Sequence, residues 1–403
     1  MNDSKFCAVP ITEHVYWVGA IDWNIRDFHG YATSRGTTYN AYLIMDEKIT
    51  LVDTVKRPFF DEMIARIRSV VDPSKIDYIV SNHAEMDHNG SLPEAIDLIK
   101  PTQVYSSTMG RAALQDHFHW DTKVQAVKDQ EKLSIGALEL QFFETRMLHW
   151  PDSMFTWIEK EKLLFSQDAF GMHLASAHRF ADEFPTSVLV EEGAKYYANI
   201  LLPYAPLIPK LIARCRQLQL NAEIIAPDHG PVFRRDLGPV LERYLQWSAQ
   251  KPTDKIVIVY DTMWESTHQL ARTLEERFRQ LGHPVSVLRL HVAHRSDVIT
   301  ELLDAGAICV GSPTLNNQMF PTLADFLTYA AGLKPRNLLG LAFGSYGWSG
   351  EGVKKVADAL TAMGVEVPDS VKCKYRPDDA ALVRCREAAT ELSTVLRARL
   401  EQV

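Results

Sequence analysis

The 403-residue sequence lacks paired cysteines and long apolar runs. Its five cysteines are scattered and form no Cys-x-x-Cys pair, which excludes a zinc ribbon, a rubredoxin-type iron site and a disulfide scaffold. No apolar run approaches the roughly 20 residues that span a bilayer. Residues 1–10 lack the apolar core of a secretory leader. These absences predict a cytoplasmic protein that does not enter a membrane.

Charge and length narrow the class of protein further. The formal net charge of -8 argues against a broad nucleic-acid surface. A chain of this length exceeds one ordinary hydrophobic core, so two domains are expected. The polar segment 251–255 separates two regions that differ in the order of their predicted strands and helices. We therefore predict one domain over residues 1–250 and another over 251–403.

The first region mixes short strands with helices. Strands are predicted at residues 39–45, 49–54, 75–80, 138–143, 154–158, 162–166 and 223–226. Apolar residues at helical spacing predict helices at 59–71, 92–100, 188–201 and 206–218. The combination indicates a layered sheet covered by helices.

The second region alternates regularly between strand and helix. Strands are predicted at residues 256–260, 285–290, 307–310, 338–343 and 365–367. Helices are predicted between and after them at 268–281, 297–305, 322–333, 352–363 and 378–400. Five such units in about 150 residues indicate a doubly wound parallel sheet.

Side chains able to bind metal are concentrated after the strand at 75–80. They are His83, Glu85, Asp87 and His88, all within six positions. His149, Asp168 and His229 each follow a further predicted strand. Functional groups of a sheet-based protein gather on loops at strand ends, so these residues are expected to converge on one pocket.

The set suits two ions with mixed nitrogen and oxygen ligands. His83, Glu85 and His149 can serve one ion, and Asp87, His88 and His229 a second. Asp168, with two carboxylate oxygens, is suited to bridge them. An oxygen-rich set without thiolate favours iron or manganese over zinc, and iron brings redox chemistry. The other histidines are interpreted as packed or surface residues.

Three loops of the second region, 262–267, 312–317 and 344–350, follow successive strands. In a flavodoxin-like strand order these loops meet around one ligand. Hydroxyl groups at a helix start form an anion cradle, and the third loop carries two aromatic rings. The absence of Gly-x-Gly-x-x-Gly from the first loop argues against NAD or FAD. This pattern predicts FMN, with Glu265 pointing away from its phosphate.

The expected FMN contacts are distributed over the three loops. They are Thr262, Met263, Trp264, Ser266, Thr267, Ser312, Pro313, Thr314, Asn316, Asn317, Ser345, Tyr346, Gly347, Trp348, Ser349 and Gly350.

The chain resembles the flavodiiron proteins, or A-type flavoproteins, over essentially its whole length. The resemblance rests on His83-x-Glu85-x-Asp87-His88 with His149, Asp168 and His229, and on segments 22–30, 148–154, 195–200 and 344–350. It implies a metallo-β-lactamase-like αββα sandwich followed by a flavodoxin-like domain. It also implies two irons bridged by Asp168, with His29 and Tyr197 bordering their open face. Asn89 departs from the small residue more usual in the family.

The resemblance further implies a reaction. Dioxygen would be reduced to water, or nitric oxide to nitrous oxide, with electrons relayed through FMN. The donor would be a separate rubredoxin-like or other small redox protein, because this sequence has no rubredoxin-like extension. A head-to-tail homodimer, or a dimer of such dimers, would bring the flavin of one subunit to the irons of the other.

Two other functions remain open from the sequence. A zinc hydrolase of the same first-domain fold would use its metal to activate water, with an accessory second domain. A flavodoxin-like electron carrier would have a degenerate first domain. Glu85 and the FMN loops argue against the hydrolase, and the complete ligand set argues against the carrier. No residue type separates dioxygen from nitric oxide as the substrate.

Overall fold

The computed structural model describes residues 6–120 and 123–402, so the first five residues of the segment examined for a leader lie outside it. The chain divides into two compact units. The first comprises Met1–His29, Thr33–Tyr196 and Pro206–Leu245, and the second Gly30–Ala32, Tyr197–Ala205 and Gln246–Val403. The boundary proposed at residue 250 stays a prediction. Among the described residues, none of the helices has the length and apolar character of a membrane span.

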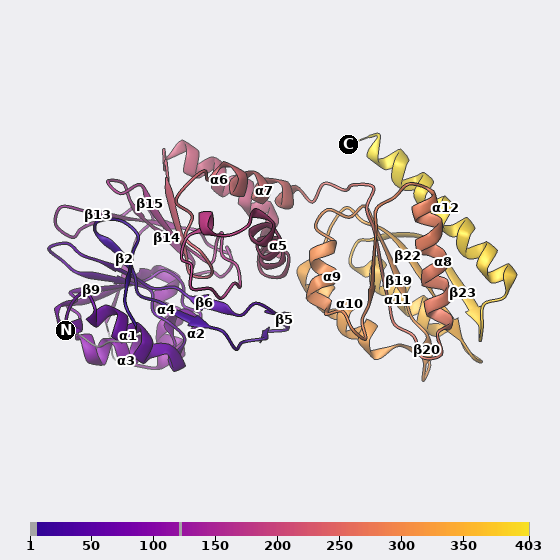
Figure 1. Ribbon diagram of the computed structural model, residues 1–403, viewed down its shortest axis with the longest axis horizontal. Coiled ribbons are helices and arrows are strands. Elements are labelled where there is room, and N and C mark those ends of the chain that lie inside the picture. The colour runs from indigo at the N-terminus through magenta and orange to yellow at the C-terminus, as the bar shows by residue number, and fades with distance from the viewer. Residues whose placement is uncertain (1–5, 121–122, 403) are drawn as a thin grey trace. The chain divides into compact units, whose positions relative to one another are not determined.

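The first unit is built on two sheets (Figure 1). One sheet has the order β1 (Val9–Pro10), β2 (Val15–Trp17), β7 (Tyr42–Ile44), β8 (Thr50–Val52), β9 (Tyr78–Ser81), β10 (Gln103–Ser107) and β11 (Val124–Val127). The other has the order β12 (Lys132–Ser134), β13 (Glu139–Glu144), β14 (Met154–Ile158), β15 (Leu163–Gln167) and β16 (Ile224–Pro227). Short strands β3 (Ala20–Asp22) and β6 (Thr37–Tyr39) pair separately, and β4 (Asp27–Phe28) and β5 (Tyr31–Ala32) follow β3 in the chain.

Helices complete the first unit, and some of them pack on the outer face of its first sheet. They are α1 (Phe60–Arg68), α2 (Met86–Asn89), α3 (Leu92–Ile99), α4 (Thr108–Phe118), α5 (Thr186–Tyr196), α6 (Ile208–Gln217) and α7 (Gly238–Ala249). Shorter helical turns are Arg57–Phe59, Pro73–Lys75 and Ala181–Glu183. Two further turns, Tyr197–Leu201 and Leu202–Leu207, lie wholly or mostly in the second unit. One buried cluster joins the two sheets, and a second joins the first sheet to α1, α3 and α4. This is the expected αββα sandwich, and it leaves the strand ends of both sheets free to carry polar groups.

Two local departures from the predicted elements have clear physical causes. The strand predicted at 39–45 is divided into β6 and β7, because buried Asn40 bonds Trp17 and a distant loop instead of continuing one ladder. The helix predicted at 188–201 changes after Tyr196 into a turn of π-helix over Tyr197–Leu201. The stretch from β10 to β11 was not predicted, since β10 contains Gln103 and two serines and lacks a run of apolar residues.

The second unit contains a fully parallel sheet of order β18 (Val285–Arg289), β17 (Ile256–Tyr260), β19 (Ala307–Gly311), β22 (Leu339–Tyr346) and β23 (Glu366–Lys374). Helices α8 (Ser266–Gln280) and α12 (Asp379–Leu400) pack on one face through a shared apolar cluster. Helices α9 (Arg295–Glu301), α10 (Pro321–Leu333) and α11 (Glu351–Ala362) cover the other face (Figure 1). A small hairpin, β20 (Thr314–Leu315) with β21 (Gln318–Met319), follows β19. The doubly wound, flavodoxin-like fold is confirmed.

Candidate metal centre and cofactor pocket

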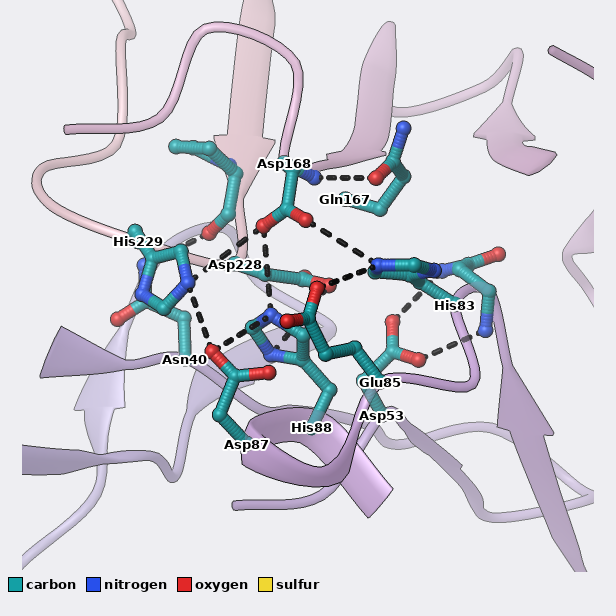
Figure 2. Close-up of polar contacts among 12 residues, drawn as sticks. Asn40, Asp53, His83, Glu85, Asp87, His88, Gln167, Asp168, Asp228 and His229 are labelled. Atoms are coloured by element: carbon teal, nitrogen blue, oxygen red, sulfur yellow. Dashed lines mark hydrogen bonds and ion pairs between the residues drawn. The ribbon is translucent and has the colours of Figure 1, made fainter. Parts of the chain in front are cut away.

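The predicted metal-binding residues converge at one end of the two sheets of the first unit (Figure 2). They are His83, Glu85, Asp87, His88, His149, Asp168 and His229. Strand β9 ends at Ser81, so the loop after it and the short helix α2 present the first group from one short stretch. Strands β15 and β16 end directly before Asp168 and the Asp228-His229 pair. Parallel pairing of β15 with β16 places these two exits side by side.

One group of ligand atoms consists of nitrogens from two histidines and oxygens from two carboxylates. His83 Nε2 lies 3.2 Å from Glu85 Oε2 and 3.4 Å from Asp168 Oδ2. His149 Nε2 lies 3.3 Å from the same glutamate oxygen and 2.9 Å from the same aspartate oxygen. These four atoms surround one point.

A second group lies on the opposite side of Asp168. Its other oxygen, Oδ1, is 3.3 Å from His88 Nε2 and 3.5 Å from His229 Nε2. Asp87 Oδ2 is 3.4 Å from the first of these nitrogens and 3.1 Å from the second. Asp168 is thus shared between both groups, as the sequence predicts for a bridging ligand.

The donor set fits two metal ions. Both oxygens of Asp87, both ring nitrogens of His88 and Oδ1 of Asp168 are buried without a hydrogen-bond partner among the described residues. Atoms that bind one ion tetrahedrally at about 2.1 Å lie about 3.4 Å from one another, which matches the observed separations. Buried polar atoms without partners are costly, and two cations would satisfy those that face the two ligand groups.

The charges of the buried side chains in the centre also favour the binding of cations. Burial by itself lowers the pKa of His83, but the carboxylates of Asp152, Glu85 and Asp168 outweigh it and hold the pKa well above its usual range. Burial raises the pKa of Asp168, yet the surrounding histidines, His88 first, hold it well below its usual range. Without metal, protons on the histidines therefore compensate the carboxylates, and metal binding displaces those protons.

Residues outside the ligand set orient the imidazole rings. The Nδ1 atom of His83 lies 3.0 Å from Asp152 Oδ2, which also accepts a hydrogen bond from the Ala84 amide at 2.6 Å. The Nδ1 atom of His229 lies 2.6 Å from the carbonyl oxygen of Thr38. In both cases a partner at Nδ1 leaves Nε2 facing the centre, an arrangement typical of metal-bound histidine. These partners are distant in sequence, and no local pattern marks them.

Of the two pocket residues predicted from the resemblance, His29 borders the centre and Tyr197 does not contact the ligands. His29 is exposed, and its Nε2 lies 3.6 Å from Glu85 Oε1 at the edge of the centre. Tyr197 is buried and packs against Trp247 in the second unit. Its neighbour Tyr196 instead packs against the ring of His229, at a centroid distance of 6.0 Å. Tyr196 ends helix α5, and Tyr197 begins the turn of π-helix that follows, so the two adjacent side chains point in different directions.

His173, interpreted from the sequence as an ordinary packed histidine, borders the centre. Its ring centroid is 4.8 Å from that of His229, and its Nδ1 lies 2.8 Å from Thr37 Oγ1. Burial and then the neighbouring His229 hold the pKa of His173 well below its usual range, so this ring is neutral. It contributes bulk and no charge beside the ligands.

Asn89 fastens the loop that carries the first ligands. Its amide nitrogen donates to the carbonyl oxygen of His83, and its Oδ1 accepts from Ser81 Oγ at 2.9 Å. A small residue could make neither bond. Asn89 therefore acts on the backbone of the loop and does not reach the ligand atoms.

The second unit has a pocket of about 500 Å³ beyond the ends of β17, β19 and β22. Its lining combines residues from all three predicted loops with two more from the segment after β23. The lining residues are Met263, Trp264, Ser266, Pro313, Thr314, Leu315, Asn316, Asn317, Ser345, Tyr346, Gly347, Trp348, Ser349, Tyr375 and Arg376. Both Trp264 and Trp348 are almost fully exposed, at 88% and 87%. Two broad rings at the mouth of an apolar pocket suit a flat ring system.

Four expected FMN contacts do not line this pocket. Thr262, Ser312 and Gly350 lie beside it, and Thr267 is fully buried with its hydroxyl 3.0 Å from Ser345 Oγ. Leu315, Tyr375 and Arg376 were missed, the last two because they follow a strand whose full length was not predicted. Glu265 is paired with Arg289, whose Nη2 lies 3.3 Å from Glu265 Oε1. That ion pair accounts for an acidic residue beside an anion cradle.

Both units of the chain are similar to known proteins. Residues 37–230 match the family described as ODP family beta lactamase, and residues 258–388 match the flavodoxin family. The rubredoxin-oxygen oxidoreductase of Megalodesulfovibrio gigas is 46% identical over 98% of this chain and 99% of its own length. The nitric oxide reductase of Moorella thermoacetica is 43% identical over 96% of this chain and 98% of its own.

A solved structure with the same two-part fold is the flavodiiron protein of Giardia intestinalis. It is 32% identical, has a TM-score of 0.94, and the match covers 98% of each chain. The fold and these relatives define an oxidoreductase built from a metallo-β-lactamase-like domain and a flavodoxin domain. The chain belongs to the flavodiiron protein family.

Proposed function

We propose that this protein reduces dioxygen to water, nitric oxide to nitrous oxide, or both, as a flavodiiron oxidoreductase. Full-length relatives named for each of the two activities support this. The observation that carries the proposal is the division of Asp168, whose two oxygens face two separate ligand groups. When bound, two irons and FMN supply the electrons that both reductions require. A hydrolytic zinc site would leave the flavin-type pocket of the second unit without a role.

The side chains of the first unit prepare this centre. The ligand groups of His83 and His229 are held by Asp152 and the Thr38 carbonyl, so neither ring needs to reorient when a metal binds. Tyr196 and His173 cover the His229 side with apolar ring surface. His29, on the exposed side, lies where a small gas molecule and protons would enter beside Glu85.

The partners follow from the same proposal. The exposed tryptophans at the flavin pocket, Trp264 and Trp348, offer apolar surface where a separate small electron donor can approach. A rubredoxin-like protein is the expected donor. We further propose a head-to-tail homodimer, or a dimer of dimers, and a cytoplasmic location.

One experiment separates this function from its alternatives. The purified chain is analysed for FMN and iron, then supplied anaerobically with one reduced donor and with each gas in turn. We expect about one FMN and two irons per chain and rapid consumption of at least one gas. A colourless zinc protein that hydrolyses esters or amides would refute the proposal. A flavin protein that consumes neither gas would identify an electron carrier.

A further inference from the structure

We propose that Asp228 is the positioning residue of His88, accepting the Nδ1 proton of that ring so that Nε2 remains the metal-facing atom. This inference rests on the proposed diiron function. It concerns a carboxylate that is not itself a ligand in either group described above. It also explains why a buried acid precedes the ligand His229.

The side chain of Asp228 lies in the interior beside His88 (Figure 2). It is fully buried, and neither of its oxygens has a hydrogen-bond partner among the described residues. Among the described residues, His88 is the one side chain within 4 Å of Asp228 that can carry a positive charge. Its Nδ1 atom lies 3.7 Å from Asp228 Oδ2. A buried carboxylate without a donor is strongly unfavourable, so a partner is expected.

The imidazole ring of His88 also lacks hydrogen-bond partners. Neither of its ring nitrogens has a hydrogen-bond partner among the described residues, although Nε2 faces Asp87 and Asp168 at 3.4 and 3.3 Å. The separation at Nδ1 exceeds a hydrogen bond by only a few tenths of an ångström. A small rotation of either side chain closes it.

The backbones of both residues are fixed, so their approach is built into the fold. The Asp228 amide donates to the Gln167 carbonyl at 2.9 Å, and the Asp228 carbonyl accepts from the Asn40 amide at 2.8 Å. On the other side, the Thr54 amide donates to the His88 carbonyl at 3.0 Å. Neither residue can therefore withdraw from the other without breaking these contacts.

The same centre contains two independent examples of this arrangement. His83 meets the Asp152 carboxylate at Nδ1, and His229 meets the Thr38 carbonyl, each leaving Nε2 toward the ligand group. Asp228 supplies the corresponding acceptor for His88. A fixed tautomer matters because only an unprotonated Nε2 can bind a metal.

The wild-type protein provides the first test. The full chain with FMN is loaded with Zn²⁺ and labelled with ¹⁵N-histidine, and the His88 signals are identified by their loss in His88→Gln. We expect Nε2 bound to zinc and a downfield, exchange-protected proton on Nδ1. Zinc on Nδ1, or an Nδ1 proton without a hydrogen bond, would overturn the proposal.

The variant Asp228→Asn provides the second test. It should abolish the downfield shift at His88 and weaken one of the two zinc equivalents by about 10- to 100-fold. The matched control Asp152→Asn should move the His83 signals and leave those of His88 in place. Unchanged His88 signals and unchanged zinc affinity in Asp228→Asn would overturn the proposal.

A structural role is distinguished by the metal-free protein. Asp228→Asn keeps the size of the buried side chain and changes only the acceptor at His88 Nδ1, so loss of zinc affinity should be its main effect and the metal-free protein should still fold. A lower Tm together with unchanged zinc affinity would show a structural role and overturn the proposal. If the variant does not fold, the wild-type spectrum still decides. Zinc binding requires no gas reduction, so failure of the proposed enzymatic function would be seen separately.

Discussion

Asp168 and His149 meet across the centre with Oδ2 2.9 Å from Nε2, which leaves the other oxygen of Asp168 directed toward His88. Asp168→Ala removes a ligand from both groups at once. We expect the iron content to fall below one per chain. We expect gas reduction to fall by more than about 100-fold, because loss of a ligand should exceed the 10- to 100-fold effect of losing a residue that only hydrogen-bonds a ligand. Iron analysis and anaerobic turnover measure both effects, and FMN content should not change.

A single-group variant is the control for that experiment. His83→Ala removes a ligand from one group only, so we expect iron content near one per chain, loss of gas reduction and retained flavin. Full activity with two irons in either variant would contradict the ligand assignment.

Asn40 is a second target, because it holds the turn that carries His229. Its Nδ2 donates to the carbonyls of Pro227 and Gly230 at 2.6 and 3.0 Å, and its Oδ1 accepts from Trp17 Nε1 at 2.8 Å. Asn40→Ala removes these partners from the Trp17 indole and the Gly230 carbonyl, whereas the Pro227 carbonyl still accepts from the Tyr42 hydroxyl at 2.7 Å. We expect the free energy of unfolding to fall by about 2–4 kcal/mol, measured by urea denaturation.

Exposed Asn24 provides the matched control for Asn40. Asn24→Ala should change the free energy of unfolding by no more than about 0.5 kcal/mol. Equal effects of the two substitutions would contradict the bracing role of Asn40.

Gly344 tests the cofactor pocket. A Cβ atom at this position would lie 1.8 Å from the carbonyl oxygen of Ser312, on the neighbouring pocket loop. Gly344→Ala must therefore push the two loops apart. We expect loss of FMN on purification with iron content retained, measured by absorbance and metal analysis.

Gly332 provides the control for Gly344, because a side chain added there meets no obstruction. A Cβ at Gly332, in helix α10, meets no atom within 4 Å. Gly332→Ala should retain FMN and stabilise the protein by up to about 1 kcal/mol through helix propensity. Retained FMN in Gly344→Ala would show that the two pocket loops can separate without loss of the cofactor site.

The cysteines differ in their expected reactivity. Burial raises the pKa of Cys373 to about 11 and that of Cys385 to about 12, and it also raises the pKa of Cys309. Cys7 is exposed. At pH 8 a thiol reagent should therefore modify Cys7 first and the three buried thiols only after unfolding.

Peptide mapping by mass spectrometry identifies the modified residues, and Cys7→Ser should abolish the rapid phase. Modification of Cys309 in the folded protein at the rate of Cys7 would show that the core of the second unit opens locally.

The sequence predicted the second unit more completely than the first. Alternating apolar strands and amphipathic helices over residues 256–400 specify a parallel sheet by local pattern, and all five strands were found. The first unit has strands of only two or three residues, such as β1, β7 and β8, and these are held by distant neighbours. Short strands with polar residues, such as β10, carry little period-two signal, so their pairing depends on tertiary contacts.

The metal-binding residue types and their order were already determined by the sequence, because ligand chemistry depends on side-chain identity. Asp168 was expected to bridge for the same reason. The tertiary structure alone decided which groups orient the ligands. Asp152 is far in sequence from His83, and Thr38 is far from His229. Asp228 is likewise far in sequence from His88. Only the packing of two sheets brings them within a few ångströms, and hydrogen bonding depends on that distance.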